Sequence, residues 1–95
     1  MKTIYLKEGQ SNPRSFTGIV IRPFGKTIWI RNGAQHRDGG LPSLECPEYK
    51  SWCIDGRYHR LDGPAIEEAD GLCWYYLDGK YINEQDYWND PRTGI

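Results

Sequence analysis

The chain has 95 residues, a net charge of −1, 14% aromatic residues, 11 glycines and 6 prolines. A chain of this length forms one domain, residues 1–95, and buries only about two-thirds of its unfolded surface. The many turn formers and the single methionine argue against a helical bundle. No apolar run is long enough to span a membrane.

The charge is divided along the chain. Residues 1–50 contain eight Lys and Arg against four Asp and Glu, a balance of +4, and residues 51–95 contain four against nine, a balance of −5. A chain with this division can bind a charged protein surface or associate with itself. The basic residues are scattered rather than clustered, so general nucleic-acid binding is not expected.

The N-terminal part, residues 1–31, is expected to hold three strands. Residues 3–7 alternate polar and apolar side chains, and residues 18–22 and 27–31 are rich in β-branched ones. Turn formers follow the first strand at residues 8–13. The turn at residues 23–26 joins the other two strands into the clearest hairpin of this half.

A repeat of 23 residues dominates the next part, residues 28–79. Trp29 is matched by Trp52, the pair His36-Arg37 by His59-Arg60, and Asx-Gly pairs recur at residues 32–33, 55–56 and 78–79. Each Asx-Gly pair supplies the positive φ that a tight turn needs. This pattern predicts repeated β-hairpins, with strands at residues 43–46, 50–54, 64–68 and 72–77.

The repeat register predicts which side chains share a face of the sheet. Trp29, Trp52 and Tyr75 fall on one face, and a core position is favoured for them. Both faces are partly apolar, so the C-terminal helix and loops, or a partner, must cover the second one. The residues expected on that second face are Ile28, Ile30, Cys53, Trp74 and Tyr76.

The third unit departs from the repeat and predicts a short helix. Asn83 is a good N-cap, acidic residues follow it, and Asp90-Pro91 ends the segment. We therefore expect a helical cap at residues 83–89. The predicted fold is mainly β, an antiparallel meander of repeated β-hairpins with about six or seven strands and a short C-terminal helix.

The cysteines point to a reducing compartment and not to a metal site. Cys46, Cys53 and Cys73 are odd in number and form no C-x-x-C pair, and no apolar signal segment is recognised, so the cytoplasm is the expected location. Their spacings of 7 and 20 do not fit the paired ligands of structural zinc. We expect no cofactor and no metal.

The segment HRLDGPAI at residues 59–66 is the most distinctive motif. Together with the following turn, the Trp-Tyr strand and the next Asp-Gly pair, it resembles the HR-x-DGPA repeats of small phage and bacterial proteins, which are similar to MORN (membrane occupation and recognition nexus) repeats. The likeness covers residues 28–82, is weaker at HRDGGLPS in the first unit and ends after Gly79. It implies a binding scaffold in a phage-encoded accessory protein, with no catalytic residues.

A His and an Arg near an Asp could act on a phosphate. The duplication of the motif favours a structural turn instead, in which Arg pairs with Asp and His caps a carbonyl. The predicted function is a non-enzymatic protein of the host cytoplasm that binds and inhibits a bacterial host protein, such as a defence factor. The alternative is a binder of a nucleotide-like ligand, with Arg37 or Arg60 on phosphate. The predicted contact residues are His36, Arg37, Tyr58, His59, Arg60, Asp62, Tyr81 and Trp88.

Overall fold

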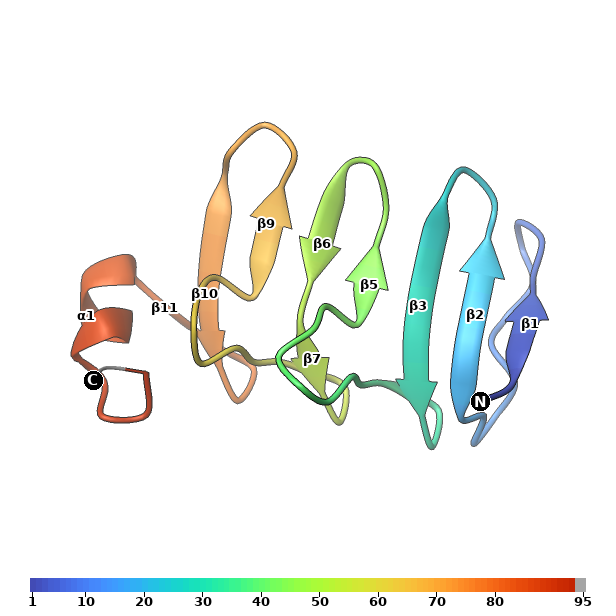
Figure 1. Cartoon of the computed structure of the whole chain (residues 1–95), viewed down its shortest axis with the longest axis horizontal. Helices are drawn as coiled ribbons and strands as arrows, with labels where there is room; N and C mark the ends of the chain where they lie inside the picture. Colours follow the sequence, from blue (N-terminus) through green and yellow to red (C-terminus); the bar gives the residue numbers. More distant parts are fainter. Residues whose placement is uncertain (94–95) are drawn as a thin grey trace.

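β-Hairpins stand side by side along the longest axis of the molecule, with the N-terminus near one end and the helix at the other (Figure 1). The computed structural model describes residues 1–93, and its principal extents are 40 × 28 × 19 Å. The elements are β1 (Thr3–Tyr5), β2 (Gly18–Arg22), β3 (Lys26–Arg31), β4 (Ala34–Gln35), β5 (Leu44–Glu45), β6 (Tyr49–Ser51), β7 (Cys53–Ile54), β8 (Arg57–Tyr58), β9 (Ile66–Glu68), β10 (Cys73–Leu77), β11 (Lys80–Ile82) and α1 (Glu84–Asn89).

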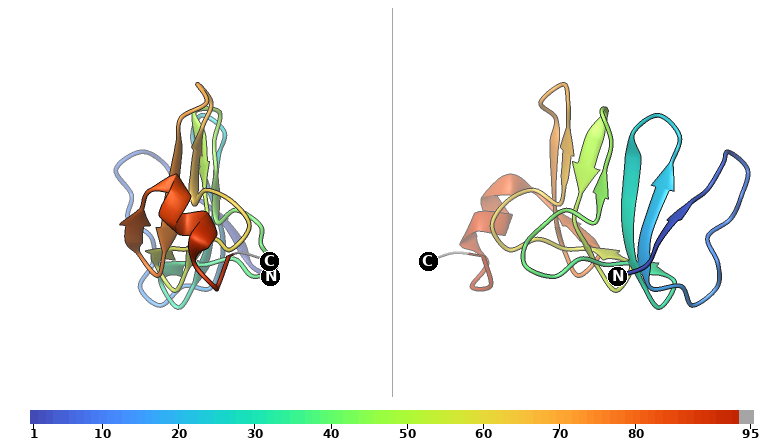
Figure 2. Two further views of the ribbon diagram at one scale, coloured as in Figure 1. Left: turned by 90° about the vertical axis from the view of Figure 1, so that its left-hand side faces the viewer. Right: turned by 45° about the vertical axis from the view of Figure 1, so that its right-hand side comes forward.

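The main sheet has the order β1-β2-β3-β5-β6-β9-β10-β11, β4 also pairs with β3, and β7 and β8 form a separate pair. A mainly β, mostly antiparallel fold with a short C-terminal helix is thus confirmed. One strand departs from the antiparallel meander, since β1 pairs in parallel with β2. The loop over residues 6–17 carries the chain back past the sheet, so β2 starts beside the start of β1 (Figure 2).

The described chain contains eleven strands rather than the predicted six or seven. The additional strands β4, β8 and β11 directly follow the Asx-Gly turns. In each turn the Asx residue has a φ of 50° and the glycine a φ of 80°, the type I′ geometry that returns a chain onto the strand it has just left. Even two residues therefore pair. The predicted strand at residues 50–54 is also divided, because Trp52 separates β6 from β7.

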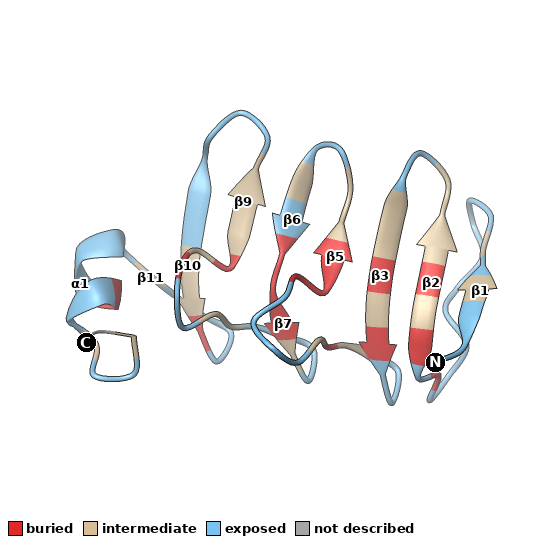
Figure 3. Ribbon diagram, in the orientation of Figure 1, coloured by how far each residue is buried: buried red, intermediate tan, exposed pale blue. Residues whose placement is uncertain are grey.

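The apolar core lies against one face of the N-terminal half of the sheet. Its buried members are in contact with one another, and Leu6 of the loop over residues 6–17 packs against them. Figure 3 shows burial in β2, β3 and β5 and from the end of β6 into β7, whereas the outer part of β10 is exposed. The buried members of this core cluster are Phe16, Val20, Ile28, Ile30 and Leu44.

One row of side chains runs from β1 to β10 on this core face. Strand register connects Ile4, Val20, Ile28, Leu44, Ser51, Ile66 and Trp74 in sequence. The row is buried from Val20 to Ser51, whereas Ile66 is half-buried and Trp74 at the far end is 38% exposed. The loop thus covers only the first part of the face.

The helix α1 begins where the sequence predicts. The Asn83 side chain accepts a hydrogen bond from the Asp86 amide at 2.9 Å, and acidic residues occupy the first turn, which favours the N-terminus of a helix. Asp90 is the C-cap. Within residues 1–93, no helix has the length and apolar character that a membrane crossing requires.

Candidate functional site

The C-terminal half of the sheet presents two different faces. Successive side chains of a strand point to opposite sides, so Tyr75 of β10 lies on one face and Trp74 and Tyr76 on the other. The face of Tyr75 is the polar-loop face, because the loops at residues 36–42 and 59–65 lie over it (Figure 1). The face of Trp74 and Tyr76 is the aromatic face.

The second polar loop is held by Arg60. The guanidinium carbon lies 3.7 Å from the centre of the Trp52 ring, a cation–π contact. Its nitrogens donate to the Asp62 carboxylate at 3.0 Å, to the Pro64 carbonyl at 3.0 Å and to the Glu67 carboxylate at 2.9 Å. The predicted pairing of Arg with Asp is confirmed here. Trp52 is only 5% exposed, which fits its predicted core position.

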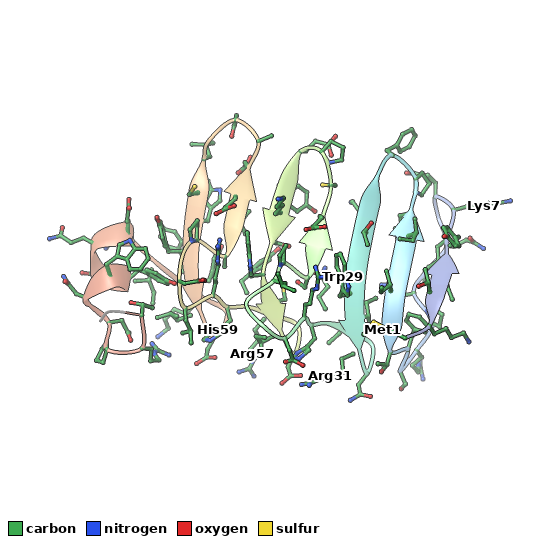
Figure 4. All side chains as sticks on the ribbon, in the orientation of Figure 1. Met1, Lys7, Trp29, Arg31, Arg57 and His59 are labelled. Carbon is green, nitrogen blue, oxygen red and sulfur yellow. The ribbon has the colours of Figure 1, made fainter. Side chains whose placement is uncertain are left out.

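The two histidines join successive units. His59 Nδ1 accepts a hydrogen bond from the Asp78 amide at 2.9 Å, and His36 Nδ1 accepts one from the Asp55 amide at 3.0 Å. The expectation that His caps a carbonyl is therefore wrong. The type I′ turn of the following unit directs the Asx backbone N–H toward the imidazole ring, so Nδ1 of the ring acts as the hydrogen-bond acceptor. Figure 4 shows His59 near the lower edge of the sheet, where the turns lie.

The first polar loop repeats this stacking but not the ion pairs. Arg37 lies 3.7 Å from the centre of the Trp29 ring, which is half-buried, and donates to the Pro42 carbonyl at 3.1 Å. The only nearby loop carboxylate, Asp38, instead accepts from His36 Nε2 at 2.8 Å. In the described part of the chain, Arg37 forms no ion pair.

The third unit replaces the stacked arginine by Tyr87 of α1. The Tyr87 and Tyr75 ring centres are 4.8 Å apart, and Tyr87 is 0% exposed. Its hydroxyl accepts from the Gly63 amide at 3.2 Å and donates to the Arg60 carbonyl. The helix thereby closes the row of units on the polar-loop face.

The aromatic face carries a cluster of four rings, the aromatic patch: Tyr58, Trp74, Tyr76 and Tyr81. Ring centres are 5.0 Å apart for Tyr58 and Tyr76, 5.8 Å for Tyr76 and Tyr81, and 6.2 Å for Trp74 and Tyr81. Tyr58 is 37%, Trp74 38% and Tyr81 55% exposed. Partial burial raises the pKa of the Tyr58 hydroxyl, so Tyr58 stays uncharged at neutral pH.

The eight predicted contact residues separate into four groups. His36, His59, Arg60 and Asp62 are engaged in contacts within the loops. Tyr58 and Tyr81 come together in the aromatic patch. Trp88 lies on the opposite face, with ring centres 6.1 Å from Tyr75 and 4.9 Å from Tyr87. Arg37 has no ion-pair partner among the described residues.

Trp74 and Tyr76 belong to the patch but are missing from the predicted contact residues. Their alternation with Tyr75 was the available signal, because it places both on the face that no later hairpin covers. Leu41 and Leu61, on the two polar loops, are also missing from that prediction and are 49% and 47% exposed. Leu61 stands directly after the repeated His-Arg pair, where the motif indicates a structural turn.

Comparison of the chain with protein-family models, with curated proteins and with solved structures finds no match. The likeness to HR-x-DGPA repeats therefore stays a prediction. Within residues 1–93, no three His, Cys, Asp or Glu side chains gather as metal ligands would. The geometry of the two faces alone supports the functional proposal.

The cysteines should differ in reactivity and respond to pH. Cys73 is exposed and Cys53 buried. Partial desolvation and the carboxylates of Glu67 and Glu84 raise the pKa of the Cys73 thiol, and burial raises that of Cys53. Because the thiolate is the reactive form, iodoacetamide should modify Cys73 before Cys53, and more slowly than glutathione at pH 7. The rate at Cys73 should rise as the pH increases past the ordinary thiol pKa.

Mass spectrometry of the native protein over a pH series measures these rates, and a Cys73→Ser variant is the control for the site of modification. Modification of Cys53 as rapid as that of Cys73 in the folded protein would contradict the burial of Cys53. A Cys73 rate equal to that of glutathione at pH 7 would contradict the raised pKa.

Proposed function

We propose that this chain is a non-enzymatic binding protein that attaches to another protein through the aromatic patch. The observation that carries the proposal is the patch itself, four rings linked by three neighbouring contacts on the part of the face that the loop over residues 6–17 leaves open. Trp and Tyr are the residues most enriched at the energetic centres of protein interfaces. Contiguous exposed apolar groups mark interaction sites in small proteins.

Carboxylates border the patch and favour a basic partner surface. Trp74 Nε1 donates to the Glu68 carboxylate at 2.7 Å, which fixes the ring beside a negative charge. Asp70 lies at the adjacent hairpin tip, and residues 51–95 carry a balance of −5. Complementary charge at the rim accelerates association and selects among partners. The partner is expected to present lysine or arginine around an apolar centre.

On the resemblance to HR-x-DGPA repeats, we extend the proposal to the biological setting. The chain is a phage-encoded protein of the host cytoplasm, and its partner is a bacterial host protein such as a defence factor. Binding covers a surface of that protein and inhibits it. The number of partners bound is one per chain, since the patch is single among residues 1–93.

A pull-down of tagged protein from bacterial lysate, followed by mass spectrometry, identifies the partner. Affinity for that purified partner is then measured by calorimetry for the wild type, Trp74→Ala and Tyr81→Ala. Each truncation removes an exposed ring at the centre of the contact and should weaken binding by about 2 kcal/mol, or roughly thirtyfold. The folded state should be retained, because both rings are exposed.

Trp88→Ala is the matched control, because Trp88 is 42% exposed but lies on the opposite face. Equal losses for Trp88→Ala and Trp74→Ala would reject the aromatic patch as the contact. An empty pull-down together with a thermal shift produced by nucleotides would favour the small-ligand alternative. Sizing at low and high salt distinguishes self-association, since contacts between opposite charges weaken as salt rises.

A further inference from the structure

We infer that Arg37 forms an oxyanion site that binds a ligand combining a carboxylate with an apolar group. The inference is independent of the aromatic patch, because Arg37 and the stacked Trp29 lie on the polar-loop face. It begins from a difference between two units of one chain. Both stack an arginine at 3.7 Å over a tryptophan, but only Arg60 is neutralised by carboxylates, those of Asp62 and Glu67.

The difference has a local cause in the sequence. The residue two positions after Arg60 is Asp62, whereas Gly39 stands two positions after Arg37. Asp38 is one position too early and bonds to His36 instead. Glu45 faces Lys50 across its hairpin, as Glu67 faces Cys73, but it forms no ion pair with Arg37. The first unit thus retains the positioned guanidinium and lacks its anion.

Arg37 has hydrogen-bonding capacity to spare. A guanidinium carries five N–H donors, and within residues 1–93 the Arg37 guanidinium makes one hydrogen bond, to the Pro42 carbonyl. Stacking on the Trp29 ring fixes its plane before any ligand arrives, which lowers the entropic cost of binding. Arg60 shows the preferred partner, since carboxylate oxygens at 2.9 and 3.0 Å occupy the corresponding donors.

A cleft beside Arg37 indicates that the ligand also carries an apolar group. Its volume is about 350 Å³, which lies at the small end of the range for ligand pockets. The exposed Leu41 and Leu61 stand on the two polar loops that border it, and Trp52 lies between them. A carboxylate on Arg37 would place an attached apolar group against these side chains. The cleft is lined by Arg37, Leu41, Trp52, Arg60, Leu61 and Asp62, among others.

The test follows the Nε–Hε signals of the arginines by NMR in the intact protein while N-acetyl-leucine is added. We expect a saturable shift of the Arg37 signal and little change at Arg60, whose Nε and Nη1 donors are already occupied. N-acetyl-leucinamide, which lacks the carboxylate, should bind at least about tenfold more weakly, since a hydrogen bond between charged groups is lost. Acetate, which lacks the apolar group, should also bind more weakly.

Two further ligands distinguish the source of the carboxylate. A hexapeptide ending in leucine with a free C-terminus should bind as well as N-acetyl-leucine if the natural ligand is a protein C-terminus. It should bind more weakly if the ligand is a small free acid. Inorganic phosphate tests whether any oxyanion suffices. Phosphate binding that equals N-acetyl-leucine would overturn the apolar part of the inference.

Variants provide a second readout. Arg37→Gln should abolish the saturable response, and Arg37→Lys should weaken it, because Lys lacks the bidentate fork. Leu61→Ser should weaken N-acetyl-leucine binding without affecting acetate. If Arg37→Gln does not fold, the comparison of the Arg37 and Arg60 NMR responses in the wild-type protein still tests the inference. The inference fails if Arg37 does not respond, if the amide acts as well as the acid, or if the exposed Arg57 shifts equally.

Discussion

Replacement of Tyr87 by alanine should lower the free energy of unfolding by about 3–5 kcal/mol, the usual cost of truncating a buried aromatic side chain. Tyr87 is 0% exposed and is the largest fully buried side chain of the described chain. The variant loses ring contacts with Tyr75 and Trp88 and leaves the Gly63 amide without its acceptor. The melting temperature of so small a domain should fall by roughly 12 °C or more, as measured by circular dichroism.

Two milder variants separate the parts of this effect. Tyr87→Phe keeps the ring and removes the hydroxyl that contacts Gly63 and Arg60, so it should cost about 1–3 kcal/mol. Trp88→Ala removes a neighbouring ring that is 42% exposed and should cost less than Tyr87→Ala. If Tyr87→Ala unfolds at the wild-type temperature, α1 does not close the row of units as described.

Replacement of Gly18 by alanine should destabilise the protein by about 3 kcal/mol, through steric overlap added to backbone strain. A Cβ at this position would lie 2.2 Å from the Lys2 carbonyl oxygen and 2.8 Å from Phe16 Cζ, at a φ of +152°. The Lys2 carbonyl accepts the Ile19 amide at 2.8 Å, so its displacement also breaks the parallel pairing of β1 with β2. Urea unfolding measures the loss, and hydrogen exchange at the Ile19 amide locates it.

Gly9→Ala is the matched control for Gly18→Ala. Gly9 has a φ of +81°, and no neighbouring atom lies within 4 Å of an added Cβ. It therefore reports backbone strain alone, about 1 kcal/mol. Equal losses for both variants would mean that β1 does not contact Gly18.

The repeated Asx-Gly pairs and the helix cap were predictable because each depends on a few adjacent residues. Asn32, Asp55 and Asp78 all adopt the positive φ that the pattern requires, and Asn83 caps α1. The strands β4 and β8 have two residues each, too few to show alternation. Their pairing follows from turn geometry, which the prediction used only for the turns themselves.

The repeat pattern could not predict that Arg60 forms ion pairs with loop carboxylates whereas Arg37 does not. The 23-residue register holds up to the His-Arg pair and then shifts, since Arg37 reaches Pro42 five residues on and Arg60 reaches Pro64 four residues on. That one-residue difference decides which carboxylate meets the guanidinium. Side-chain pairing across a loop depends on its path in space, which pattern matching along the chain does not describe.

The aromatic patch was only half predictable. Alternation assigns Trp74 and Tyr76 to the face opposite Tyr75, as the sequence predicts and the strand register confirms. The coverage of that face depends on how far the loop over residues 6–17 extends, and its length and polar composition do not indicate this. Trp88 and Tyr81 are both predicted contact residues, yet the sheet separates them.

Because neighbouring hairpins contact one another in the same way, a chain of this kind can gain or lose whole repeat units. The ring of His36 receives the amide of Asp55, and the ring of His59 receives that of Asp78, so each unit presents the same acceptor that the next one needs. A duplicated unit inserted between them could form the same histidine-to-amide hydrogen bond with the unit before it and with the unit after it. Deletion of a single residue within a strand would exchange the two faces of everything beyond it. Related chains should therefore differ by entire hairpins, with the parallel first strand and the tyrosine-bearing helix kept at the two ends.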